Sequence, residues 1–247
     1  MEKCQFDVIG VVRSPFSEKF GVPRQPGLVP AARFSIEFRS DYDRPEAFRG
    51  LDEFSHVWLV FLFHQALRGQ WKPTVRPPRL GGNERVGVFA SRSPFRPNAI
   101  GLSSATLLAV EQQAGRTVLQ LAGLDLVDGT PVLDIKPYIA YADSHPGARS
   151  GFAATVPALV PVRWRESALS DARVVEQRLP GFVTLVEQVL AQDPRPAYIA
   201  NDADRDYGTM LYDVNVSWRV VEFGSRFTVE VLSVNRQHWN DQSILRT

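Results

Sequence analysis

Residues 66–98, called the basic segment below, concentrate positive charge in a chain whose formal net charge is only +1. Seven basic residues stand here against a single acid, Glu84, and they are Arg68, Lys72, Arg76, Arg79, Arg85, Arg92 and Arg96. A guanidinium group can hold a phosphate or a carboxylate through two parallel hydrogen bonds, and it can stack on a flat base. Five prolines stiffen the segment, and Gly81-Gly82 allows the backbone to approach a ligand closely. These features indicate a binding loop for a polyanion or a small charged ligand.

The end of the basic segment combines charge with an aromatic ring. Residues 91–98 (SRSPFRPN) place Phe95 between Arg92 and Arg96. A phenyl ring flanked by two guanidinium groups would stack on bases while the guanidiniums hold phosphates. The sequence therefore predicts a stacking and phosphate-binding surface, whereas a solvated loop is the alternative.

Two other segments offer similar chemistry. Residues 23–27 (PRQPG) combine a cation and an amide with a Pro-Gly turn. In residues 193–198 (DPRPAY), Arg195 stands between two prolines and Tyr198 follows. An arginine whose backbone is already restricted loses less entropy on binding, which favours a role in recognition.

Acids and a histidine supply the remaining candidates. Asp125, Asp128 and Asp134 cluster around a predicted hairpin, where they serve either turn formation or the binding of a cationic or hydroxylated part of a ligand. His64-Gln65 is a polar pair at the end of an apolar run. It is either a satisfied histidine at the rim of a barrel or part of a pocket floor.

Composition excludes several classes of protein. With 44% hydrophobic and 22% charged residues, the 247-residue chain is typical of a packed, soluble protein. No apolar run reaches the length of a membrane span, and the first residues lack a signal-peptide core, so we expect a cytoplasmic protein without membrane contact. One cysteine and four scattered histidines predict neither disulfides nor a metal site. Phosphate-binding and hydrolase motifs such as GxGxxG after a strand, GxxxxGK[ST] and GxSxG are missing from the sequence.

The first part of the chain, residues 1–148, has the pattern of a β-barrel. Short runs of β-branched and aromatic residues separated by turns predict seven or eight strands. A run at 54–65 should be a central strand buried on both faces, and a short helical turn is expected at 45–48. Other strands are predicted at 6–12, 34–38, 85–91 and 132–138, with hairpins joining 100–110 to 117–124 and spanning 125–131 around Asp128-Gly129.

Residues 144–154 (SHPGARSGFAA) are small and polar and contain glycine, which is typical of a linker. The linker is predicted at 149–160, between the barrel and a second unit at 161–247. Helical periodicity follows at 167–179 and again at 182–190, where apolar residues recur at helical spacing. Strands are predicted at 210–220 and 227–234. The fold class is therefore mainly β, an N-terminal single β-barrel with a small C-terminal α+β domain.

Six motifs in this order resemble the TsaA-like family and, more closely, its two-domain bacterial TrmO branch. They are PRQPG (23–27), HQ (64–65), RPPRLGGN (76–83), SRSPFRPN (91–98), DLVDGTPV (125–132) and DPRPAY (193–198). The resemblance implies a barrel that binds S-adenosyl-L-methionine. It also implies methylation of N6 of threonylcarbamoyladenosine (t6A) at position 37 of tRNA, which gives m6t6A. A homodimer with cofactor pockets at or near the subunit contact is expected.

Matching the family residue by residue gives the expected cofactor shell. It consists of Arg24, Gln25, Pro26, Gly27, His64, Gln65, Arg92, Leu102, Asp125, Leu126, Val127 and Asp128. The acceptor nitrogen is urea-like and weakly nucleophilic, so the reaction needs a base or a polarising contact. Asp128 and Tyr198 are the candidates for this role. The anticodon loop of tRNA would be bound by Arg76, Arg79, Arg96 and Arg195. Of these, Arg96 or Arg195 suits the threonyl carboxylate.

Two other classes of function use the same residues. A non-catalytic RNA-binding module would need the arginine-rich loops but no cofactor. A ligand-responsive barrel would bind a nucleoside without transferring a group. Measurements of S-adenosylmethionine binding and of methyl transfer to tRNA would distinguish these two classes from a methyltransferase.

Overall fold

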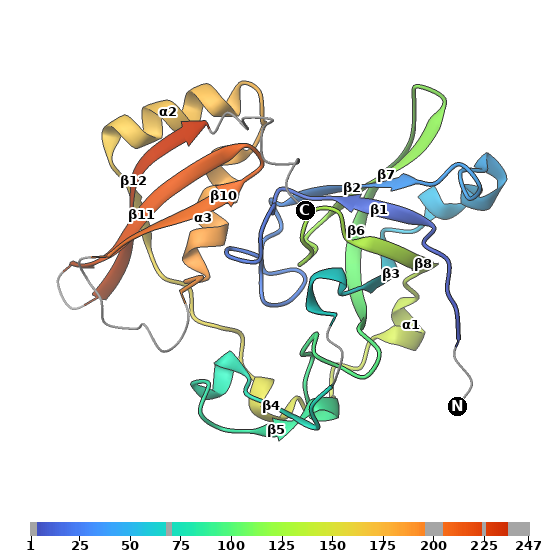
Figure 1. The fold of residues 1–247 in the computed structure, drawn as a ribbon. Coiled ribbons are helices and arrows are strands. Elements are labelled where there is room, and N and C mark those ends of the chain that lie inside the picture. Colours follow the sequence, from blue (N-terminus) through green and yellow to red (C-terminus); the bar gives the residue numbers. More distant parts are fainter. Residues whose placement is uncertain (1–3, 68–70, 196–204, 224–225, 237–247) are drawn as a thin grey trace, which may run out of the picture.

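The computed structural model describes residues 4–67, 71–195, 205–223 and 226–236 of the chain. In Figure 1, a barrel formed by the earlier part of the chain lies beside a sheet and two helices formed by the later part. The basic segment and residues 149–157 lie together at one end of the molecule, below both units in this view.

Six antiparallel strands close the barrel in the order β1-β2-β7-β6-β3-β8. Their bounds are β1 (Gly10–Arg13), β2 (Arg33–Phe38), β3 (His56–Leu62), β6 (Ile100–Gln113), β7 (Arg116–Ala122) and β8 (Pro131–Pro137). Side chains alternate between the interior and the outside, and Ile36, Leu59 and Leu119 are fully buried inside. The predicted barrel is confirmed. Among the described residues, two further strands, β4 (Thr74–Val75) and β5 (Val86–Gly87), form a separate ribbon instead of joining it.

Strand β3 differs from its prediction as a strand buried on both faces. Val57, Leu59 and Phe61 are buried, but the alternate positions Trp58 and Val60 are only partly buried. Trp58 packs against the Tyr138 ring, with centroids 5.5 Å apart, and donates from Nε1 to Asp143 Oδ2 at 2.9 Å. The prediction of two-sided burial was wrong.

The two predicted hairpins have opposite outcomes. Strands β6 and β7 pair across a turn in which Ala114 (φ 50°) and Gly115 (φ 76°) are both left-handed, as a two-residue hairpin turn requires. The hairpin over 125–131 was wrong, because β7 pairs with β2 and β6 while β8 pairs with β1 and β3. Asp128-Gly129 does form a turn, but within a connection that crosses the end of the barrel.

The strand predicted at 85–91 was also wrong in extent. Only Val86–Gly87 is extended, and a 3-10 turn, η5 (Val88–Ala90), follows at once. Its partner β4 is flanked by prolines, which lack the N–H needed to extend the ladder.

Short helical turns make up most of the remaining structure of the barrel half. The turn expected at 45–48 is confirmed as η1 (Pro45–Phe48). The others are η2 (Leu51–Glu53), η3 (His64–Ala66), η4 (Pro78–Leu80), α1 (Ala140–Asp143) and η6 (Gly151–Ala153). Within the described residues, no helix is both long and apolar enough to cross a membrane.

The later part of the chain forms a four-stranded sheet in the order β10-β11-β12-β9 with two helices. The bounds are β9 (Val162–Trp164), α2 (Glu166–Glu176), α3 (Phe182–Ala191), β10 (Asp206–Leu211), β11 (Val214–Phe223) and β12 (Arg226–Arg236). The apolar stripe of α3 is buried as its periodicity predicts. The single strand predicted at 210–220 is in fact two, because Tyr212 adopts a left-handed conformation (φ 57°) and reverses the chain.

Residues 14–32, called the joining segment below, run between β1 and β2 of the barrel and also contact the C-terminal unit. The Tyr212 amide donates to the Pro15 carbonyl at 2.7 Å, and the Ala31 amide donates to Gln188 Oε1 at 2.8 Å. Phe20 stacks on the buried ring of Trp218 with centroids 6.4 Å apart. One continuous cluster of buried side chains therefore runs through the barrel and the C-terminal sheet.

Candidate functional site

A wide pocket of about 1810 Å³ lies where the basic segment meets residues 24–28 and residues 149–157. Its described lining contains no acidic residue but eight basic ones: Arg24, Lys72, Arg76, Arg79, Arg85, Arg92, Arg96 and Arg149. Such a concentration of one sign of charge in a concave surface attracts anions and raises their local concentration. The predicted binding loop for a polyanion is therefore part of a real cavity.

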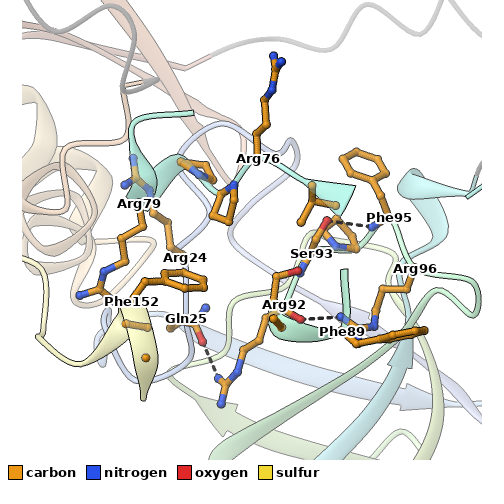
Figure 2. A pocket seen from close by; sticks show the side chains of 18 of the residues that line it. Arg24, Gln25, Arg76, Arg79, Phe89, Arg92, Ser93, Phe95, Arg96 and Phe152 are labelled. Atoms are coloured by element: carbon orange, nitrogen blue, oxygen red, sulfur yellow. Dashed lines mark hydrogen bonds between the residues drawn. The ribbon is translucent and has the colours of Figure 1, made fainter. Parts of the chain in front are cut away.

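Arg92 and Gln25 both line this pocket and meet in it. The Arg92 Nη1 atom donates to Gln25 Oε1 at 2.5 Å, as Figure 2 shows. Arg24, on the same loop, donates from Nη2 to the carbonyl of Arg195 at 3.3 Å. Two motifs that are far apart in sequence, PRQPG and SRSPFRPN, are thus brought into direct contact.

The loop carrying Pro26 and Gly27 continues toward the end of strand β7. The Gly27 amide donates to the Gly123 carbonyl at 2.7 Å, and both glycines have positive φ (80° and 74°). A Cβ atom on Gly123 would lie 3.7 Å from the Gly27 Cα, so the two backbones are in close contact. Asp125, two residues further on, is therefore held near the Gln25–Arg92 pair.

Asp125 is a recessed carboxylate. Burial raises its pKa, while a hydrogen bond from Ser103 Oγ to Oδ1 (2.7 Å) and the positive charge of Arg92 lower it. The Arg92 guanidinium therefore lies within electrostatic range of this acid. A carboxylate in such surroundings gains from a bound cation, which would offset the cost of burying its charge.

The rest of the DLVDGTPV motif is held by the joining segment. Ser14 donates from its amide to Asp128 Oδ1 (2.9 Å) and from its hydroxyl to the Leu126 carbonyl (2.6 Å). The Thr130 hydroxyl donates to the Val127 carbonyl at 2.6 Å. Arg13 Nη1 lies 3.9 Å from Asp128 Oδ2, so both carboxylate oxygens of Asp128 have a protein partner. Residues 125–128 do not line the pocket, and a role for Asp128 as a base stays a prediction.

His64 and Gln65 form the 3-10 turn η3 directly after strand β3. Burial lowers the pKa of His64, which favours the neutral imidazole, and the charge of Lys19 acts in the same direction. The Gln65 carbonyl accepts from Lys19 Nζ at 2.8 Å. The next residue, Ala66, lines the pocket, so this pair lies at its border.

Leu102 lies apart from the other predicted cofactor residues. It is 56% exposed and points outward from strand β6, opposite Val60 on β3. Its neighbour Ser103 points inward and binds Asp125. Leu102 therefore does not line the pocket of its own chain.

The DPRPAY motif is only partly described. Asp193 binds Arg195 through two hydrogen bonds, 2.7 Å to Nε and 2.8 Å to Nη2, and only 9% of Arg195 is exposed. The Asp193 carboxylate raises the pKa of the Arg195 guanidinium. RNA binding by Arg195 stays a prediction, and Tyr198 lies outside the described residues.

The predicted sandwich of Phe95 between two guanidinium groups was wrong. Arg92 turns toward Gln25, and the Arg96 guanidinium lies 5.9 Å from the centroid of the Phe89 ring instead (Figure 2). Phe89 itself was missed because it sits in a segment predicted as a strand. Arg96 also donates to the Ser91 carbonyl at 2.7 Å, which fixes the guanidinium in place.

Residues 149–157 were predicted only as a linker, yet they form one wall of the pocket. Arg149 and Phe152 line it, and Arg79 Nη2 donates to Thr155 Oγ1 at 3.4 Å. Arg149 and Phe152, which stand among small residues, were the sequence features that could have indicated a binding role for this segment. Across the described residues, no group of three or more histidine, cysteine or acidic side chains could hold a metal ion.

Comparison with known proteins identifies the family. Residues 11–144 match the tRNA-methyltransferase O N-terminal domain, and residues 157–237 match the TrmO C-terminal domain. The tRNA (adenine(37)-N6)-methyltransferase of Escherichia coli is 48% identical over 226 residues, which cover 91% of this chain and 96% of that protein. A Pseudomonas aeruginosa protein named as a putative S-adenosylmethionine-dependent methyltransferase is 53% identical over 211 residues, 85% of this chain and 90% of that protein.

Solved structures agree with the sequence matches. A crystal structure of TrmO from Pseudomonas aeruginosa has a TM-score of 0.79 at 43% identity, covering 95% of this chain and 99% of that one. The names of relatives confirm S-adenosylmethionine as the methyl donor at the level of the family. Since both family models match in order and span most of the sequence, the chain belongs to the TrmO family of tRNA methyltransferases.

Proposed function

We propose that this chain transfers a methyl group from S-adenosylmethionine to N6 of t6A at position 37 of tRNA and so forms m6t6A. The observation that carries the proposal is the contact between Arg92 and Gln25, beside the recessed Asp125, in a pocket whose described lining holds eight basic residues and no acidic one. The names of relatives, which specify adenine 37 of tRNA, support the coarser activity.

Arg92 and Gln25, which line the pocket, and Asp125, which lies within electrostatic range of Arg92, fit the cofactor. Its carboxylate suits the Arg92 guanidinium, its positively charged groups suit the Asp125 carboxylate, and its adenine suits the amide of Gln25. When bound, the cofactor supplies an electrophilic methyl group on a sulfonium. Pro26 and Gly27 fix the loop that carries Gln25, so these residues act mainly by holding the donor in line with the acceptor.

The outer part of the pocket fits an anionic acceptor. Of the arginines expected to bind the threonyl carboxylate, Arg96 is held by Ser91 and Arg195 is held by Asp193. Arg76 has no hydrogen-bond or ion-pair partner among the described residues and points into the open in Figure 2. We therefore assign the threonyl carboxylate to Arg76 and backbone phosphates to Arg79 and its neighbours.

The remaining expectations belong to the same proposal. Residues 1–148 would bind the cofactor, residues 149–160 would link the units, and residues 161–247 would assist in tRNA recognition. A cytoplasmic homodimer is expected, in which the outward-facing Leu102 could reach a pocket of the other subunit.

Mass spectrometry of digested tRNA tests the proposal. The purified chain is incubated with S-adenosylmethionine and with two tRNAs that differ only in carrying t6A or adenosine at position 37. We expect one added methyl group on t6A and none on plain adenosine. Methylation of both tRNAs would reject the finer substrate while keeping the coarser activity, and unchanged nucleosides in both would favour the non-catalytic RNA-binding module.

A further inference from the structure

Two exposed aromatic rings stand together at the wall of the pocket. Trp71 is 50% exposed and Phe89 is 74% exposed, and their ring centroids are 6.3 Å apart at an interplanar angle of 35°. Both residues line the pocket. Large rings gathered at one exposed place mark a contact surface more often than isolated exposed residues do.

The local fold holds this pair in position. Val88 is buried and anchors the 3-10 turn η5, so the next residue, Phe89, is projected outward. The Val88 amide donates to the Pro73 carbonyl at 2.9 Å, which ties the backbone beyond Trp71 to the same turn. Arg96 supports the Phe89 ring at 5.9 Å and is itself fixed by Ser91 (Figure 2). The Phe89 ring is therefore held facing outward, and Trp71 packs against it.

The charge around the rings selects the occupant. Eight basic and no acidic residues line the pocket in the described part of the chain, which favours a polyanion that also has flat apolar faces. Unpaired RNA has both properties, because its bases can stack on aromatic side chains while its phosphates meet arginines. We propose that Trp71 and Phe89 form a stacking platform for an unpaired base that neighbours the methylated adenosine.

This inference rests on the proposed function for the identity of the RNA, so its test measures binding apart from catalysis. The full-length chain is titrated into a fluorescently labelled anticodon stem-loop RNA, and the dissociation constant is read from anisotropy. Phe89→Ala and Trp71→Ala should each weaken binding about tenfold, whereas Phe89→Tyr should keep it within about twofold. The slope of binding against salt should not change in these variants, because no charge is removed.

Tyr141→Ala is the matched control, since Tyr141 is 92% exposed and does not line the pocket. It should bind the RNA as the unaltered chain does. If Phe89→Ala and Trp71→Ala bind the RNA as tightly as the control does, the proposed platform is wrong. A changed oligomeric state of these variants in sedimentation would assign the rings to a subunit contact and would also overturn it.

The two proposals fail differently. A chain that binds the RNA but adds no methyl group to t6A would contradict the proposed function, while the binding series would still decide the platform. Normal methylation together with unaltered affinity of both ring variants would contradict the platform alone.

Discussion

The joining segment and the basic segment are both irregular in secondary structure, yet they differ in how they are held. In the joining segment, Phe16, Val29 and Ala32 are at most 1% exposed, and the backbone bonds to both the barrel and the C-terminal sheet. In the basic segment, Trp71 and Phe89 are exposed and the side-chain hydrogen bonds are mostly local, as between Arg85 and Thr74. The first is part of the core, and the second is a surface attached to it.

This difference suits two kinds of ligand. A small donor must be held in one geometry, which requires a loop fixed by surrounding packing. RNA is bound by distributed charges and stacking faces, which need exposure more than burial. The contact between Gln25 and Arg92 is the point where the two segments meet.

Paired phenylalanine substitutions test the contrast most strongly. Phe16→Ala should lower the free energy of unfolding by about 3–5 kcal/mol, because a fully buried ring packed against Phe34 is removed. Phe89→Ala should change it by no more than about 0.5 kcal/mol. Urea denaturation followed by circular dichroism measures both, and equal destabilisation would show that the basic segment is part of the core after all.

Cofactor binding should depend on Arg92 at the meeting point. Arg92→Ala is expected to weaken binding of S-adenosylmethionine by about 1–3 kcal/mol, because a charge-assisted contact is lost. Arg85→Ala is the control, since Arg85 lines the same pocket but binds Thr74 instead of Gln25. Isothermal titration calorimetry measures both variants. Equal losses would mean that the pocket acts through its overall charge and not through the Arg92 contact.

Features encoded by neighbouring residues were predictable from the sequence, and those that depend on distant contacts were not. The β6–β7 hairpin followed from two alternating runs around Gly115, and α3 followed from its apolar spacing. The closure of β8 onto β1 and β3 depends on pairing across the whole barrel, so the local turn at Asp128-Gly129 suggested the wrong partner.

The site shows the same limit. The motifs supplied Arg24, Gln25 and Arg92. In residues 149–157 only Arg149 and Phe152 suggested a binding role, and their place in the pocket wall depends on contacts distant in sequence, such as that between Arg79 and Thr155. Arg96 lies over the Phe89 ring, and Phe89 belongs to a 3-10 turn where the sequence predicted a strand. Val88 in that turn is buried and bonded through its amide to Pro73, a contact that the sequence alone does not specify.

Asp125 should make the stability of the folded chain depend on pH. Since burial raises its pKa in the folded state, its favourable contribution to stability is full below the unfolded pKa and is lost as pH rises through the folded pKa. Asp125→Asn should therefore be more stable than the unaltered chain at neutral pH, with a difference that shrinks in acid. Its affinity for the cationic donor should fall about tenfold. Thermal unfolding across pH measures the first effect, and an advantage that grows in acid would contradict it.

The smallest expected effect concerns a single arginine of the basic segment. Arg79→Gln should weaken RNA binding less than tenfold at moderate salt, and it should make the slope of log affinity against log salt shallower by about 0.7, as for one lost phosphate contact with a single strand. Arg116→Gln removes an equal charge from strand β7, outside the pocket lining, and serves as the control. An unchanged slope with lost methylation of t6A would place Arg79 on the threonyl carboxylate and not on a phosphate. A shallower slope in both variants would mean that the RNA responds to the net charge of the chain and not to the pocket.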